Sequence, residues 1–543
     1  MSSEKEDGAV EKLMEEGPKQ VESVEDKYDK LKEFDMAEHV ETAYAGMGKE
    51  ELLKYANSPF WVRLRWLLFV AFWLSWFAMM FGALFIIFMA PKCFPQRPIE
   101  WYQKSPVYII NAANLGKEGV DAKIDYIKKL GIENVVLSSA LHGDNDQVID
   151  FLKVNASLGT IDSMKDLITK LKSKGLKVML KIVPNQSSLT NMFFERSVMK
   201  ENEFKDYYVW SPGQINDKGN FPINNWLSVN GGSAWTWHES RREFYLHQFS
   251  DTEPDFNFRN KDVVKYFEDV FKFWLDAGVD GLYLDKVQYL FEDKSFQNET
   301  INSKDANARN YNSYSHTFTT DLPETYQLLS KWGELISKKS GFLILSDVDS
   351  KNISGVNIAH SPIVLPSDFT GEQLLGILVK KTSSHWPSWE WTCGEGNNCW
   401  KNETLEAFNI LSSLLKGTPV IQADNNIFAN NLIPNITLVD STLKELRATP
   451  AFEYGSFNAK LISDDNVLVF DRVISSSESY LFAWNLSKNT TTISLKTKFE
   501  EVPKDAQLIL CTTSACPILP PLKSKVDSYN LSIAAESAVV LSF

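Results

Sequence analysis

An uncharged apolar run from Trp66 to Ala90 constrains this chain more than any other feature of its sequence. As a helix with a rise of about 1.5 Å per residue, the run would be about 37 Å long, which exceeds the roughly 30 Å hydrocarbon core of a bilayer. A secretory signal would lie at the extreme N-terminus, whereas a long polar tail precedes this run. At this length the pattern favours a membrane span over a buried core helix. We therefore expect a transmembrane helix over 66–90 and an acidic, largely disordered tail over 1–60.

The residues on either side of the span predict its orientation. Lys54, Arg63 and Arg65 precede it, while Lys92 and then Arg97 follow it. The positive-inside rule places the N-terminus in the cytosol. All nine Asn-x-Ser/Thr sequons follow the span, which predicts that this side meets the secretory lumen. We expect N-glycosylation at Asn155, Asn298, Asn352, Asn402, Asn435, Asn485, Asn489 and Asn530. The ninth sequon, Asn185, falls at the end of an expected strand.

All five cysteines also follow the span, where thiols are oxidised. Cys393 with Cys399 and Cys511 with Cys516 are close enough in sequence for two local disulfides, which would leave Cys93 alone beside the membrane. An odd cysteine in an oxidising compartment suggests an intermolecular bridge. On spacing alone, an inert thiol or another pairing among the five stays open.

Small residues form a stripe along one face of the expected span. The stripe consists of Ala71, Ser75, Ala78 and Gly82, spaced by four, three and four positions. Small residues let membrane helices approach closely, although they are common in spans that contact only lipid. Together with Cys93, the stripe indicates a second membrane protein as partner.

The part beyond the span has the pattern of a large α/β domain followed by a β domain. Apolar runs at 107–112, 134–139, 177–183, 280–285 and 341–347 predict buried parallel strands, and amphipathic segments separate them. This repetition predicts a (β/α)₈ barrel, and the short strands near the C-terminus predict an antiparallel β-sandwich. We expect a neck over 91–105, the barrel over 106–440 with an insertion at about 187–256, and the β domain over 441–543. The net charge of −14 argues against a nucleic-acid partner.

Several long motifs resemble those of the α-amylase clan of glycoside hydrolases. GLKVMLKIVPNQSS (175–188) is similar to the family's third-strand motif, GVDGLYLDKV (278–287) to the fourth-strand motif and LLKGTPVIQADNNI (414–427) to the eighth-strand segment. Residues 221–237 and 245–260 resemble an α-glucosidase insertion after the third strand. The motifs occur in the family's order, and the similarity spans about residues 98–543.

The membrane end resembles a narrower group, the heavy chains of heteromeric amino-acid transporters in solute carrier family 3. The similar segment is WVRLRWLLFVAFWLSW, followed by Gly82, Ala83 and APKC. The resemblance implies a glycosylated type II protein of the plasma membrane. It also implies that Cys93 bonds a multi-spanning light chain, which this subunit stabilises and delivers to the cell surface. No cofactor is expected.

The amylase resemblance also implies roles for residues at the strand ends. Asp285 matches the nucleophile of a retaining glycosidase. Tyr283 stands where the family has an arginine, Lys181 where it has an aspartate and Gln186 where it has a histidine, while Asn185 is kept.

The general acid position falls on Asp347, one methylene shorter than the family's glutamate. WPSW (386–389) aligns Glu395 with the transition-state carboxylate. Retaining glycosidases need their nucleophile and acid about 5 to 5.5 Å apart, and residues that act as a unit lose their effect together. We therefore expect a catalytically degraded domain that is no enzyme and holds no metal, with Lys181 in an ion pair with Asp285.

Two other functions are weighed against the heavy-chain hypothesis. A surface α-glucosidase is favoured by the insertion, Asp285 and the two other carboxylates. An adhesion or signalling scaffold is supported in the sequence only by the acidic tail.

Overall fold

The protein is described by a computed structural model, which covers residues 48–89, 100–129, 131–144, 147–302, 309–348, 353–382, 386–394, 400–422 and 436–543 except 465, 476 and 497. The tail as far as residue 47 lies outside the described residues, as do Cys93, Glu395, Cys399, Asn352 and Asn435. The chain separates into two compact units, Met1–Lys92 and Cys93–Phe543.

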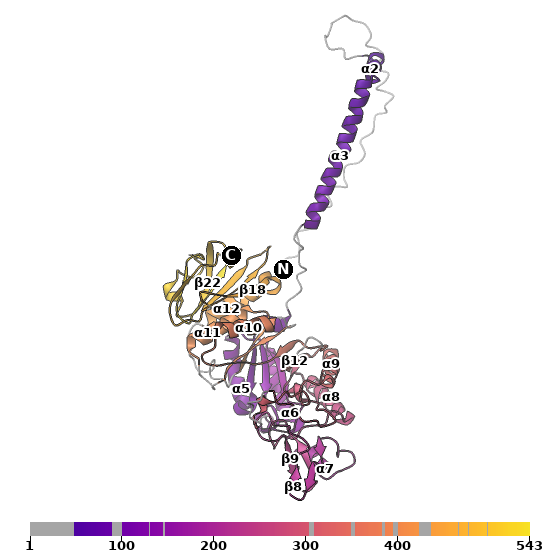
Figure 1. Ribbon diagram of the computed structural model, residues 1–543, viewed down its shortest axis with the longest axis vertical. Coiled ribbons are helices and arrows are strands. Elements are labelled where there is room, and N and C mark those ends of the chain that lie inside the picture. The colour runs from indigo at the N-terminus through magenta and orange to yellow at the C-terminus, as the bar shows by residue number, and fades with distance from the viewer. Residues whose placement is uncertain are drawn as a thin grey trace, which may run out of the picture. The chain divides into compact units, whose positions relative to one another are not determined.

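The expected membrane span belongs to one long helix, α3, Pro59–Met89, which a short helix α2, Lys49–Ala56, precedes (Figure 1). Within the described residues, α3 alone is long and apolar enough to cross a membrane, with a mean hydropathy of 2.1. The helix begins before the apolar run because Pro59 suits a first helical turn. Arg65, inside this early part, donates a hydrogen bond to the Trp61 carbonyl at 3.3 Å.

The second unit contains a parallel eight-stranded barrel, which confirms the predicted architecture. Its strands follow the order β13-β12-β11-β5-β2-β1-β17-β15. A parallel bridge between Ala359 and Pro387 closes the ring. The strands are β1 Val107–Asn111, β2 Asn134–Ser138, β5 Lys177–Ile182, β11 Gly281–Leu284, β12 Phe342–Ser346, β13 Ile358–His360, β15 Ser388–Trp389 and β17 Thr418–Gln422.

Helices surround the strands, so each strand is buried on both faces. The helices are α5 Ala112–Lys129, α6 Ile161–Ser173, α8 Lys261–Asp276, α9 Pro323–Lys338, α10 Gly371–Thr382, α11 Asn402–Leu414 and α12 Ile436–Arg447. Alternate strand residues face opposite ways. Val136 and Met179 belong to the apolar cluster inside the ring, whereas Leu137 and Leu180 pack toward the helices. This double burial explains why the strands appear in the sequence as unbroken apolar runs.

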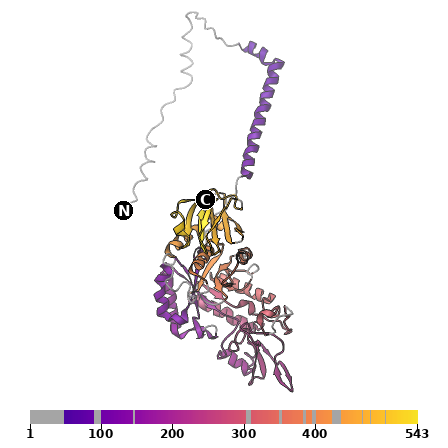
Figure 2. The ribbon, with the colours of Figure 1, turned by 60° about the vertical axis from the view of Figure 1, so that its left-hand side comes forward.

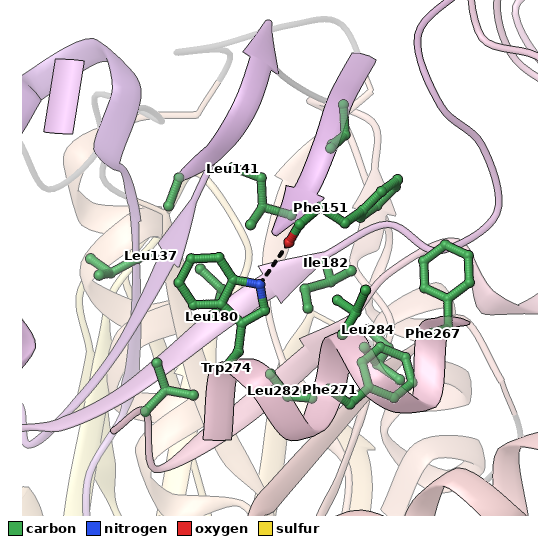
Figure 3. Close-up of a cluster of buried hydrophobic side chains, with 14 of the residues drawn as sticks. Leu137, Leu141, Phe151, Leu180, Ile182, Phe267, Phe271, Trp274, Leu282 and Leu284 are labelled. Carbon is green, nitrogen blue, oxygen red and sulfur yellow. Dashed lines mark hydrogen bonds between the residues drawn. The ribbon is translucent and has the colours of Figure 1, made fainter. Parts of the chain in front are cut away.

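The helix-facing core includes a hydrogen bond between distant segments (Figure 3). The Trp274 indole on α8 donates to the carbonyl of Phe151 at 2.8 Å, and the Trp274 side chain is fully buried. Phe151 lies on β4, Gln147–Val154, which pairs with β3, Leu141–Asp144. The bond therefore joins the β3–β4 hairpin to the barrel wall.

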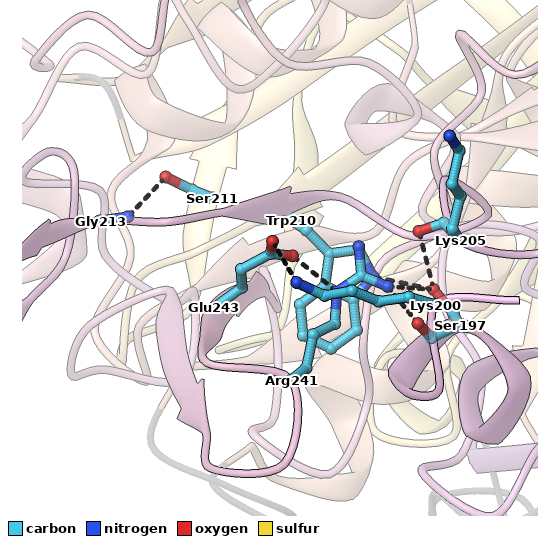
Figure 4. Close-up of polar contacts among 8 residues, drawn as sticks. All are labelled: Ser197, Lys200, Lys205, Trp210, Ser211, Gly213, Arg241 and Glu243. Atoms are coloured by element: carbon cyan, nitrogen blue, oxygen red, sulfur yellow. Dashed lines mark hydrogen bonds and ion pairs between the residues drawn. The ribbon is translucent and has the colours of Figure 1, made fainter. Parts of the chain in front are cut away.

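The predicted insertion after β5 forms a small lobe. It comprises α7 Met192–Val198, β6 Trp210–Ser211, β7 Gln214–Asn216, β8 Gly219–Phe221, β9 Trp235–His238 and β10 Glu243–Leu246. Arg241 holds it together (Figure 4): its guanidinium lies 4.1 Å from the Trp210 ring and 2.6 Å from a Glu243 oxygen. The same guanidinium donates to the Ser197 carbonyl, so one nearly buried cation joins α7, β6 and β10.

The C-terminal part is an antiparallel sandwich packed on the barrel (Figure 2). Its main sheet has the order β18-β19-β20-β25-β22-β23, and β21 pairs with β24 in a second sheet. The bounds are α13 Pro450–Tyr454, β18 Ser456–Ile462, β19 Val467–Val473, β20 Tyr480–Asn485, β21 Thr491–Ile493, β22 Asp505–Cys511, β23 Lys525–Asp527, β24 Leu531–Ile533 and β25 Ala538–Ser542. The ring of Phe408 on α11 packs against the ring of Trp484 on β20, with 4.9 Å between their centroids. This barrel helix therefore covers part of one face of the sheet.

We predict that Trp274→Phe lowers the thermal stability of the full-length protein more than Trp332→Phe does. Both tryptophans are fully buried in the same core, but the Trp332 indole has no hydrogen-bond partner among the described residues. The two exchanges remove similar volume, and only the first removes a hydrogen bond, which corresponds to a difference of about 1–3 kcal/mol. Thermal unfolding in detergent measures it, and equal losses would contradict the role assigned to the bond.

Candidate active site

The polar site lies where three neighbouring strands end. Tyr283 on β11 is in register with Lys181 on β5 and Ile344 on β12. Asp285 follows β11 directly, and Asp347 follows β12. Side chains at the carboxyl ends of barrel strands converge on one face, which is where barrel enzymes place their active sites.

Lys181 and Asp285 form the ion pair expected from the sequence. The Lys181 ammonium lies 2.6 Å from Asp285 Oδ2, and the two side chains are 21% and 15% exposed. The other oxygen, Oδ1, accepts a hydrogen bond from the Ser346 hydroxyl and one from the Lys286 backbone amide at 2.9 Å. Both oxygens of Asp285 are therefore engaged by side chains or backbone of adjacent strand ends.

The two carboxyl groups of the site have opposite pKa shifts. Burial opposes ionisation of Asp285, but the Lys181 ammonium, together with Ser346 and Lys286, holds its pKa below the usual range. Burial and then the charge of Asp285 raise the pKa of Asp347, against smaller opposing effects of His360, Ser361 and Lys381. The environment thus favours ionisation of Asp285 and opposes ionisation of Asp347, the direction that the roles of nucleophile and general acid require.

Four further polar residues border this pair, and our sequence analysis did not identify them. His360 Nε2 lies 3.1 Å from a Glu390 oxygen, and its Nδ1 lies 2.8 Å from the Ser388 hydroxyl. The His360 ring meets the Tyr283 ring edge-on at 5.5 Å. Burial lowers the pKa of Lys381 to about 8, although Asp347 and Glu390 oppose that shift. Polar residues beside the ends of β13 and β15 were the signal that could have indicated them.

Asn185 and Gln186 contact the insertion rather than the ion pair. The Asn185 amide donates to Asp255 at 3.0 Å, and the Gln186 amide donates to Glu253 at 3.3 Å. Burial raises the pKa of Asp255 well above its usual value. The sequence analysis missed both carboxylates, which lie in the TEPDF segment that ends the insertion.

The remaining candidate residues are distributed over the surface and the C-terminal domain. Cys511 is bonded to Cys516, and Cys393 is also in a disulfide. Ala71, Ser75, Ala78 and Gly82 are all exposed on α3. Four of the sequon asparagines that the structure describes are exposed: Asn298, Asn402, Asn489 and Asn530.

Two sequon asparagines use their amide groups inside the fold. Asn485 is fully buried and donates to the carbonyls of Asn489, Ile533 and Ala534. The expectation of a glycan at Asn485 is therefore corrected, because the folded domain leaves its amide no room for one. Asn155 is half-buried, and its amide donates to the Gly143 carbonyl at 3.0 Å.

We predict that Lys181→Met destabilises the protein at neutral pH and does so less as the pH falls. The pKa of Asp285 is depressed in the folded state, so its ionised form stabilises the wild type above the unfolded value of about 4, and this stabilisation is lost below the folded-state pKa. In the variant, burial is unopposed by the ammonium and raises that pKa. We expect a deficit of about 3–5 kcal/mol at pH 7 that shrinks toward pH 4.

Thermal unfolding of the full-length variant between pH 7 and pH 4 measures this change. The matched control is Lys265→Met, which breaks a 2.7 Å pair with Asp269 in which both side chains are more than half exposed. Little effect is expected there because solvent screens the pair. Similar behaviour of the two variants would contradict the assignment.

Comparisons with known proteins match both ends of the described architecture. The family "Alpha amylase, catalytic domain" matches residues 111–358, and the family "Solute carrier family 3 member 2 N-terminus" matches residues 32–108. The amino acid transporter heavy chain SLC3A1 of Homo sapiens is 28% identical over 434 residues, which cover 72% of this chain and 62% of that protein. Maltase A2 of Drosophila melanogaster is 32% identical over 312 residues, which cover 52% of this chain and 55% of that protein. The alignment thus spans less than two thirds of either relative.

Solved structures share the fold. The α-glucosyl transfer enzyme XgtA superimposes with a TM-score of 0.68 at 20% identity, covering 82% of this chain and 100% of that one. At this identity the likeness concerns the fold alone.

The prediction that the large domain is no enzyme is wrong. It depended on the exchanged residues Lys181, Tyr283, Gln186, Asp347 and Glu395, of which Glu395 lies outside the described residues. An amylase catalytic-domain family matches residues 111–358, and maltases match 52% and 77% of the chain. The prediction gave individual exchanges too much weight against similarity over whole strands, the retained Asp285 and the carboxyl group that Asp347 keeps at the acid position.

The N-terminal match contains α3, and the amylase match begins within β1 and ends at the start of β13. One helix able to span a membrane is thus joined in this chain to an α-amylase-like barrel. Residues 32–108 thus match the N-terminal family of solute carrier family 3, and the chain as a whole is similar to an amino-acid transporter heavy chain.

Proposed function

We propose that this chain is the heavy-chain subunit of a heteromeric amino-acid transporter. In this role a disulfide from Cys93 links it to a multi-spanning light chain, which it stabilises and delivers to the plasma membrane. The observation that carries the proposal is the N-terminal family match over residues 32–108, which contains both α3 and Cys93. The similarity to SLC3A1 supports the same role. The amino acid would cross through the light chain, because a single helix encloses no pore.

The two faces of α3 support a helix partner. At 100° per residue, the stripe of small residues, Ala71 to Gly82, lies opposite a face that bears Trp66, Phe69 and Trp73. The rings on that face contact one another, with centroids 5.8 Å apart for Trp66 and Phe69 and 6.2 Å for Phe69 and Trp73. A face of bulky rings is suited to contact with lipid, whereas a face of small residues lets a second helix pack closely. The proposed light chain therefore packs against the small-residue face.

The proposed orientation is type II, with the N-terminus in the cytoplasm and the barrel outside the cell. Lys54, Arg63 and Arg65 precede the apolar run, as the positive-inside rule requires for a cytoplasmic N-terminus. The disulfide between Cys511 and Cys516 suits the oxidising side of the membrane. The exposed sequons lie on the same side of the span.

We predict that native membranes contain this chain in a reducible complex. On a blot without reductant, the wild type should run larger than the monomer by the mass of a multi-spanning partner. Reductant or Cys93→Ser should collapse that band to the monomer. Cys511→Ser is the matched control, because its sulfur is bonded within the chain and its loss should leave the large band in place. A monomer in every lane would contradict the covalent link.

A second candidate function is α-glucoside hydrolysis, and the electrostatics of the strand-end site favours it. Asp285 is held ionised and Asp347 is held toward its protonated form, as a retaining mechanism requires of nucleophile and acid. Lys181 and Ser346 occupy both oxygens of Asp285, so a sugar must compete with these contacts for the nucleophile. We therefore expect slow turnover.

We predict that the purified full-length chain hydrolyses maltose slowly and that Asp285→Asn lowers kcat/KM by about 10⁴-fold or more. Activity should fall as the pH rises through the raised pKa of Asp347, because the acid then loses its proton. Asp505→Asn, an exposed carboxylate on β22 of the C-terminal sheet, is the control and should retain activity. Turnover that survives Asp285→Asn would exclude this site as its source.

A further inference from the structure

A cavity of about 310 Å³ lies where the barrel helices meet the C-terminal sheet, away from the strand-end site. Its walls include Thr382 at the end of α10, Lys416 in the turn between α11 and β17, and Arg472 on β19. Glu453 on α13 also lines it. A cavity of this size is at the lower end of the range for small-molecule sites.

Positive charge is concentrated around this cavity. Arg472 is 3% exposed, and its guanidinium donates to the carbonyls of Ala451 and Phe452 rather than to a carboxylate. Burial and then the charge of Arg472 lower the pKa of Lys416. Two like charges are thus held together in a partly desolvated place, which is costly without a counter-ion.

A third cation lies behind the cavity wall. Arg447 is 4% exposed and donates to the carbonyls of Ser413, Gln103 and Gly417. Its guanidinium lies 4.5 Å from the Phe452 ring, and that of Arg472 lies 5.9 Å from the same ring. Both terminal nitrogens of Arg447 donate to backbone carbonyls, and Arg447 does not line the cavity, so it contributes positive potential rather than a ligand contact.

The nearby acidic side chains do not neutralise this cluster. No ion pair joins Glu453 to Lys416 or Arg472 within the described part of the chain, and the Lys416 ammonium makes no hydrogen bond there. Asp471 adjoins Arg472 in sequence, but successive side chains on a strand point to opposite faces. Lys416 is therefore the group with free donors.

We propose that this cavity binds a small oxyanion, such as a phosphate group, between Lys416 and Arg472. Arginine and lysine donors facing a common space suit phosphate, whose oxygens accept several charge-assisted hydrogen bonds. The ligand would join α10 and the α11–β17 turn of the barrel to β19 of the sandwich. It would occupy a different site from a sugar at Asp285 and would not depend on a light chain.

Calorimetric titration of the full-length chain in detergent with inorganic phosphate, at constant ionic strength, tests the proposal. We expect saturable binding that Lys416→Gln weakens by about tenfold, the equivalent of one charge-assisted hydrogen bond. Glu453→Gln should tighten binding by about threefold or more, since it removes a like charge from the rim. Lys525→Gln on β23 is the control and should bind as the wild type does.

The source of the anion is distinguished by a second titration with monomeric short-chain phosphatidylserine. Lysine-dependent binding of phosphate would assign a soluble anion, and lysine-dependent binding of the lipid alone would assign a headgroup. Without ligand, the Lys416→Gln variant should unfold at the wild-type temperature, because the Lys416 ammonium makes no hydrogen bond within the described part of the chain. Absence of saturable binding for both probes, or equal affinity of all variants, would overturn the proposal.

Discussion

Closure of the parallel ring is the constraint on which the other features of the large domain depend. The backbone amide of Ala359 on β13 donates to the Trp386 carbonyl just before β15 at 3.2 Å, which joins the two ends of the strand order. Once closed, the ring has no free edge, and its apolar residues are buried both inside and beneath the helices. Within this ring, the pairing of β11 with β5 and with β12 brings Lys181, Asp285 and Asp347 to adjacent strand ends. Site geometry is thus a product of barrel geometry.

The site combines two demands that usually compete. A buried carboxylate needs partners, and Asp285 has the Lys181 ammonium and the Ser346 hydroxyl. A catalytic nucleophile must also be reachable by substrate, which these same partners oppose. The similarity to the N-terminal family of solute carrier family 3 and the similarity to maltases correspond to these two aspects of one molecule. A subunit role and slow hydrolysis are therefore compatible, because they use different parts of the chain.

The sequence predicted the features that have a strong local pattern. The strands, the barrel and the span follow from apolar periodicity. The Lys181–Asp285 pair follows from two exchanges on adjacent strands, a lysine in place of the family's aspartate at 181 and a tyrosine in place of its arginine at 283. The contacts of Asn485 with Ile533 and Ala534 join segments far apart in sequence, so a sequon pattern contains no information about them. His360 and Lys381 were missed for the same reason, since the pairing of β12 with β13 and the packing of α10 bring them near Asp347.

The attachment of residues 101–103 to the barrel has a mechanical consequence. The Tyr102 carbonyl accepts a hydrogen bond from the Thr418 hydroxyl at 3.1 Å, and the Gln103 carbonyl accepts one from Arg447 at 2.7 Å. The Trp101 ring packs 4.5 Å from that of Phe342. Tension applied to the chain N-terminal to residue 100 would act on all these contacts at once rather than break them one after another. The domain would resist such tension at β12, at β17 and at the end of α12 before any strand of the ring had to separate.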